Sequence, residues 1–192
     1  SRMSRSPVPT RLTRAVACEG APRDLGRDQG RACAERLRAR FAELPLPRRL
    51  RLRAGAGGAP GLRRELRRHF PRQAETLAGI ARAAGVPLAW LEACLDAEGA
   101  AGEPELAIAV EREGPRALVL RPVAGEWILR RSSPEGGFRS VELARPWHAH
   151  ALLGVNEQGL AAAVGIPAGG ARGGGLPSTP LLQDCLQRFA AL

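Results

Sequence analysis

Residues 126–166 have the sequence EWILRRSSPEGGFRSVELARPWHAHALLGVNEQGLAAAVGI, and this stretch decides the fold class. It contains short apolar or alternating runs, such as EWILRRS, FRSVELA and HALLGVN, which are separated by Gly, Pro and Ser. Runs of this kind at intervals of about ten residues are typical of an antiparallel sheet. Two similar runs, LAIAVERE and PRALVLRPV, precede them. We therefore expect a sheet part over residues 99–170.

The residues before this sheet part show helical periodicity. Apolar residues recur at helical spacing between Arg23 and Pro45, and again from Leu62 to Ala84. Pro71 is expected to divide the second region into two pieces, because proline cannot continue the hydrogen-bond ladder of a helix. A further helix is expected from Pro87 to about Ala97, with its proline in the first turn.

The tail of the chain returns to helical periodicity. A covering helix is expected over residues 176–192, and its apolar stripe consists of Leu181, Leu182, Cys185, Leu186 and Phe189. Helices followed by strands and a returning helix indicate an α+β fold, with helices packed on one face of an antiparallel sheet. We expect a disordered leader over 1–14 and a single domain over 15–192, with a helical part over 15–98. The stripe reaches the last residues without a cap, which predicts truncation at the C-terminus.

Composition and charge narrow the classes of partner. The 192 residues carry a net charge of +10, and every basic residue is Arg. No aromatic residue stands within the densest arginine runs, RRLRLR (48–53) and LRRELRR (62–68), so we expect no specific nucleic-acid partner. No apolar run approaches the roughly 20 residues that span a bilayer, so no membrane partner is expected and the cytoplasm is the expected location.

The cysteines, histidines and glycines that could form a metal or phosphate site lack the spacing of a known site of either kind. The four cysteines show no CxxC pair, so no zinc site and no cofactor are expected, and small buried residues are the favoured interpretation. His148 and His150 would share one face of a strand. A metal pair is one interpretation, but surface or strand-edge histidines are favoured. The glycine run at 169–175 lacks the Lys-Ser/Thr ending of a phosphate loop and is expected to be a flexible loop.

Four stretches, taken in order, carry a resemblance to a known family. They are EGAPRDLGRDQGRACAERL (19–37), PRQAETLAGIARAAGVPLAWLEACLDAE (71–98), SSPEGGFRSVELARPW with LLGVNEQGLAAAV (132–164), and GLPSTPLLQDCL (175–186). Together they resemble the acyl-coenzyme A:6-aminopenicillanic acid acyltransferase family, also called isopenicillin-N acyltransferase-like proteins. This family is a branch of the N-terminal nucleophile cysteine hydrolases.

The resemblance implies both a fold and a chemistry. The fold would be an αββα sandwich of two stacked antiparallel sheets between helical layers, here incomplete. Family members cut themselves before a cysteine, whose thiol then acts as the nucleophile with its own new α-amine as base, in amide hydrolysis or acyl transfer. Backbone and Asn donors stabilise the oxyanion. The expected ligand would be a small amide, acyl or peptide-like molecule.

The chain departs from the family pattern at the positions that perform this chemistry. Glu105 stands where the resemblance places the nucleophile Cys. In the following strand Arg121 is kept, but Pro122 and Ala124 replace the family Asn and Asp. Gly165 stands at the oxyanion Asn. We therefore expect no catalytic residue of the family type and a degenerate active site, which leaves enzyme activity an open question.

Two retained residues and three functional hypotheses follow. Arg121 could bind a carboxylate or phosphate, and Asn156 a ligand, although a solvated strand edge and a turn between strands are the favoured interpretations. The leading hypothesis is a catalytically silent or truncated family member. The first alternative is an active amidase or acyltransferase. The second is a non-enzymatic module that binds an acyl or peptide ligand, or an acidic partner.

Overall fold

The computed structural model describes residues 15–57, 59–101, 126–164 and 179–190. In chain order its elements are β1 (Val16–Gly20), α1 (Pro22–Ala42), α2 (Leu46–Arg53), α3 (Pro60–His69), α4 (Pro71–Ala84), α5 (Leu88–Ala101), β2 (Ile128–Pro134), β3 (Ser140–Ala144), β4 (Leu153–Asn156), β5 (Ala161–Ala163) and α6 (Thr179–Arg188). The described part is therefore a mixed α+β structure. None of its helices is both long and apolar enough to cross a membrane.

The five strands form one sheet in the order β1-β2-β3-β4-β5. Strands β2 to β5 pair antiparallel, which confirms the expectation for that part of the chain. The expectation of a fully antiparallel sheet is wrong at one edge, because β1 runs parallel to β2, with Cys18 opposite Ser132. Parallel neighbours need a long crossover connection, and the helical region between β1 and β2 supplies it.

The helix boundaries coincide with proline and glycine residues in the sequence. Pro71 separates α3 from α4, as predicted. Helix α4 ends at Ala84, and the next residue, Gly85, has a φ of +72°, the left-handed conformation that closes many helices and that glycine adopts without strain. The arginine run at 48–53 forms α2, a mainly exposed helix with Leu52 buried.

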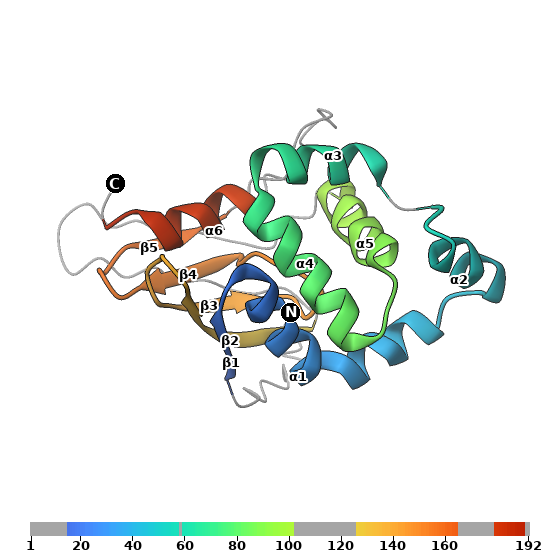
Figure 1. Cartoon of the computed structure of the whole chain (residues 1–192), viewed down its shortest axis with the longest axis horizontal. Coiled ribbons are helices and arrows are strands. Elements are labelled where there is room, and N and C mark those ends of the chain that lie inside the picture. Colours follow the sequence, from blue (N-terminus) through green and yellow to red (C-terminus); the bar gives the residue numbers. More distant parts are fainter. Residues whose placement is uncertain (1–14, 58, 102–125, 165–178, 191–192) are drawn as a thin grey trace, which may run out of the picture.

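Helices α1 and α4 pack so closely that their glycines are required. A Cβ atom at Gly26 would lie 1.9 Å from the carbonyl oxygen of Thr76, and one at Gly79 would lie 2.4 Å from the carbonyl oxygen of Arg23. The Gly-x-x-x-Gly spacing of α1 thus permits backbone contact with α4. Figure 1 shows this helix pair lying between the sheet with α6 on one side and α2, α3 and α5 on the other.

The two faces of the sheet differ in cover. On β2 the residues Ile128, Arg130 and Ser132 are buried, whereas Arg131 between them is exposed. The buried face carries the contacts to α1 and α6. On the opposite face Val141 and Val155 are 43% and 44% exposed. The covered face is therefore the one on which a polar site can be built.

Helix α6 covers this face with only part of its predicted stripe. Leu182 and Leu186 are buried, but Leu181 and Phe189 are 56% and 45% exposed. The face of α6 that contacts the sheet is therefore only partly the predicted stripe. Gln183 also faces the sheet, where its Oε1 accepts from Arg130 and its Nε2 donates to Glu142.

Candidate functional site

The covered face of the sheet carries a buried ion pair. Arg130 on β2 and Glu142 on β3 stand opposite each other in the strand register. The Nε of Arg130 donates to Oε2 of Glu142 at 2.6 Å, and its Nη2 lies 2.5 Å from the same oxygen. The two side chains are 4% and 0% exposed, so the pair lies in a low-dielectric environment.

Side chains from two helices and one strand complete this pair. The Oε1 of Gln29 on α1 accepts from Arg130 Nη1 at 2.6 Å, and the Oε1 of Gln183 on α6 accepts from Nη2 at 2.9 Å. Gln183 Nε2 and Ser140 Oγ donate to Glu142 Oε1 at 2.8 and 2.5 Å. We call Gln29, Arg130, Ser140, Glu142 and Gln183 the polar cluster.

The glutamines of the polar cluster also hold the chain between β3 and β4. Gln29 Nε2 donates to the carbonyl oxygens of Pro146 and His148 at 3.0 and 2.8 Å. Gln183 Oε1 also accepts from the backbone N–H of Ala151 at 2.8 Å. Buried polar groups are expensive unless they are hydrogen-bonded, and here each partner lies within the protein. The polar cluster therefore joins α1, α6 and the sheet.

The space beside the polar cluster is small. A cavity of about 10 Å³ borders Arg130 and Gln73, which is the order of space that a single water molecule requires. The side-chain Oε1 of Gln73 is buried there without a hydrogen-bond partner in the described part of the chain. No organic ligand fits this space, so the geometry of the polar cluster is that of a group of side chains that holds elements of the fold together.

Two of the four cysteines are buried in surroundings that disfavour the nucleophilic thiolate form. Cys18 on β1 is fully buried, and this burial raises the pKa of its thiol to about 12. Burial likewise raises the pKa of Cys33 on α1. Cys94 and Cys185 are half-buried in α5 and α6. Since the thiolate is the nucleophilic form, Cys18 and Cys33 are protonated and inert at neutral pH. The prediction of small buried cysteines is confirmed for these two.

The two histidines are buried, and the expectation of surface or strand-edge histidines is wrong. His148 and His150 lie in the connection between β3 and β4 and are 3% and 2% exposed, with ring centroids 4.7 Å apart. Burial, together with the neighbouring His148 and Arg130, holds the pKa of His150 well below its usual range. His150 is therefore neutral at physiological pH. Among the described residues no group of three His, Cys, Asp or Glu is placed to hold a metal ion.

Asn156 shapes a turn and fixes the end of a helix. Its Oδ1 accepts from the backbone N–H groups of Gln158 and Leu160, both at 3.0 Å, in the turn between β4 and β5. Its Nδ2 donates to the carbonyl oxygens of Leu186 and Phe189 at 3.0 and 2.8 Å. These four hydrogen bonds use the full capacity of the amide, which favours the turn interpretation.

The positions that the family resemblance singles out fall in other parts of the chain. Glu105, Arg121, Pro122, Ala124 and Gly165 all lie outside the described residues. Their predicted roles stay predictions.

A second cavity, of about 270 Å³, is lined by residues of α3, α4 and α5 and by Arg23 of α1. It is bordered by another ion pair, in which Arg63 Nε donates to Glu92 Oε1 at 2.7 Å and Arg63 Nη2 donates to Glu92 Oε2 at 2.5 Å. The hydrogen bond to Glu92 raises the pKa of Arg63. We call this space the helix pocket. It is a feature that the sequence alone did not reveal, because it depends on how four separate helices meet.

A scan against models of protein families finds none that matches this chain, and a search of curated proteins finds no relative. The site is therefore interpreted from its own geometry.

Proposed function

We propose that this chain is a catalytically silent member of the autoproteolytic acyltransferase and amide hydrolase family. The sequence resemblance suggests the family, and Glu105 at the nucleophile position argues against its thiol chemistry. One structural observation carries the silent assignment. Cys18 is the cysteine on the described sheet, and burial raises the pKa of its thiol to about 12. A residue so placed cannot replace a missing nucleophile.

The arrangement of layers supports the proposal. Helices cover one face of the described sheet, as they do in each half of an αββα sandwich, while the other face exposes Val141 and Val155. The polar cluster on the covered face is satisfied internally and leaves no space for an amide substrate. In this proposal its function is to hold α1 and α6 against the sheet.

The intact mass of the purified chain tests the proposal. After prolonged incubation the chain should keep its mass of 20.4 kDa. A thiol reagent should label the half-buried Cys94 and Cys185 slowly and should leave the buried Cys18 and Cys33 unlabelled. A split before Glu105 would show that self-processing survives. Amidase activity that disappears when one cysteine is replaced by Ala would contradict the proposal equally.

A Glu105→Cys variant distinguishes two reasons why the wild-type chain would stay uncut: the residue at position 105 alone, or further departures from the family pattern as well. If this variant cuts itself before position 105, the placement of the nucleophile is right and the wild-type chain is silent because of that residue. If it stays intact, other departures such as Gly165 contribute as well. Glu103→Cys, two positions earlier, is the matched control, and it should stay uncut.

A further inference from the structure

The helix pocket has a wall of apolar side chains. Leu66 of α3 and Leu77 of α4 are 3% and 2% exposed, and Leu88 of α5 stands half-buried beside them. Ala74 and Ala78 of α4 also line the space and leave it wide because their side chains are short. At about 270 Å³ the helix pocket is close to the lower end of the sizes typical of small-molecule sites. An apolar group of several carbon atoms is the kind of ligand group that could pack against these side chains.

The charged residues of the helix pocket leave an excess of positive charge. Three arginines and two glutamates line it. Arg63 is already paired with the buried carboxylate of Glu92, so neither group needs a ligand. Arg23 and Arg67 are exposed, and neither makes an ion pair with a residue in the described part of the chain. Their guanidinium groups are therefore available to an anion.

We propose that the helix pocket binds a small amphipathic monocarboxylate, with its apolar chain against Leu66, Leu77 and Leu88 and its carboxylate on Arg23 and Arg67. The planar guanidinium group matches the geometry of a carboxylate through paired hydrogen bonds. A cation would meet repulsion from the arginines. A polyphosphate would carry more negative charge than the single excess positive charge balances, and its polar body would face apolar walls.

This inference is independent of the proposed function. The helix pocket is lined by residues of α3, α4 and α5 and by Arg23 of α1, and it shares no residue with the polar cluster or with Cys18. A chain that proves to be enzymatically active would leave the helix pocket unchanged. Equally, failure of carboxylate binding would say nothing about self-processing.

Calorimetric titration of the full chain with sodium octanoate tests the inference. Octanoate should bind at a single site, octylammonium should not bind, and octanol should bind at least about tenfold more weakly because it cannot form a charged hydrogen bond. From butanoate to octanoate each added CH₂ should strengthen binding by up to about fourfold. Absence of octanoate binding at millimolar concentration, or equal affinity for octanol, would overturn the inference.

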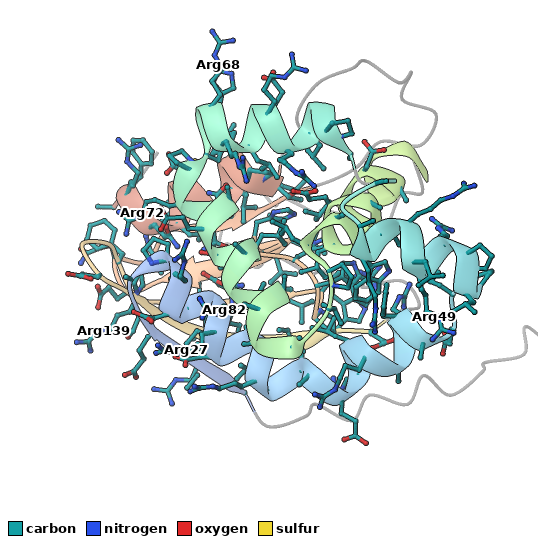
Figure 2. The ribbon with its side chains drawn as sticks, turned by 45° about the vertical axis from the view of Figure 1, so that its right-hand side comes forward. Arg27, Arg49, Arg68, Arg72, Arg82 and Arg139 are labelled. Atoms are coloured by element: carbon teal, nitrogen blue, oxygen red, sulfur yellow. The ribbon has the colours of Figure 1, made fainter. Side chains whose placement is uncertain are left out.

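A pair of double variants shows whether the named arginines hold the carboxylate. Arg23→Gln with Arg67→Gln should weaken octanoate binding about tenfold or more. Arg64→Gln with Arg68→Gln is the matched control, since it removes the same charge from exposed residues outside the helix pocket. Figure 2 shows Arg68 projecting from α3 away from the body of the molecule. Equal weakening by both double variants would mean non-specific attraction and would overturn the inference.

A variant that fills the helix pocket tests the apolar wall without changing charge. Ala78→Leu should reduce octanoate affinity while the thermal unfolding curve shows that the chain is folded. Ala78→Ser, which keeps the volume almost constant, should bind nearly as well as the wild-type chain. Unchanged affinity in a folded Ala78→Leu variant would overturn the placement of the chain in this pocket.

Discussion

The molecule uses an arginine–glutamate pair twice, and the two surroundings give the pairs different roles. In the polar cluster Arg130 and Glu142 are both buried, and glutamines from α1 and α6 take up their remaining hydrogen-bonding groups. At the helix pocket the carboxylate of Glu92 is 3% exposed, but Arg63 is 32% exposed and borders an open space. The same chemical pair thus locks elements together in one place and forms the edge of a cavity in the other.

Breaking the pair in the polar cluster should have the largest effect. Arg130→Met leaves the carboxylate of Glu142 buried without its counter-charge, and this should lower the free energy of unfolding by about 3–5 kcal/mol. Urea unfolding followed by circular dichroism measures the loss. Arg131→Met, at the exposed neighbouring position, should change it by no more than about 0.5 kcal/mol. Equal losses in the two variants would show that the polar cluster does not stabilise the fold.

Breaking the pair at the helix pocket should cost less. Arg63→Met leaves the buried carboxylate of Glu92 without its counter-charge, but the opening of the pocket lets water reach that carboxylate. We therefore expect the free energy of unfolding to fall by about 1–3 kcal/mol. The same urea experiment applies. Glu92→Gln, which removes the charge and keeps the hydrogen-bonding shape, should lose less than Arg63→Met. A loss of stability in Arg63→Met as large as that in Arg130→Met would show that the two ion pairs stabilise the fold equally.

Acidification should weaken the sheet side of the molecule through His150. Its pKa in the folded chain lies below the ordinary value of 6.5, so the unfolded chain takes up the proton first. Stability is therefore full above about pH 6.5 and falls as the pH decreases below it, by up to about 1.4 kcal/mol per pH unit. Urea midpoints at pH 7 and pH 5 measure this slope. A His150→Leu variant should show a smaller slope, and an unchanged slope would assign it to other groups.

The smallest effect is expected for the exposed arginines of α3. Arg64→Gln with Arg68→Gln should change the free energy of unfolding by no more than about 0.5 kcal/mol, because neither residue is buried or paired in the described part of the chain. Figure 2 shows labelled arginines such as Arg68, Arg49 and Arg139 at separate edges of the molecule. A larger loss in thermal or urea unfolding would indicate that surface charge matters more here than packing.

Local periodicity predicted most of the elements, because it depends on neighbouring residues. The helices α1, α3, α4 and α5 and the strands β2 to β5 fall where apolar spacing and proline positions placed them. The parallel strand β1 was missed, since nothing within Val16–Gly20 identifies a partner that lies beyond the whole helical region.

The polar cluster was harder to predict than the fold. An arginine within a strand is normally solvated, so the sequence did not single out Arg130, which the structure places on the buried face with Ile128 and Ser132. Its burial depends on Gln29 and Gln183, which stand far away in the sequence. The burial of His148 and His150 depends on the same long-range packing. For these residues the sequence supplied the chemistry but not the environment.

The parallel strand β1 also has a consequence for the order of events during folding. It pairs with β2 across the entire helical region, so its hydrogen bonds close a long loop of chain and their formation carries a large entropic cost. Contacts between near neighbours form sooner than contacts between distant ones. During synthesis on the ribosome Cys18 therefore leaves the exit tunnel well before Ser132, the residue that will stand opposite it. Until β2 pairs with β1, one of the elements that surround this thiol in the finished fold is missing.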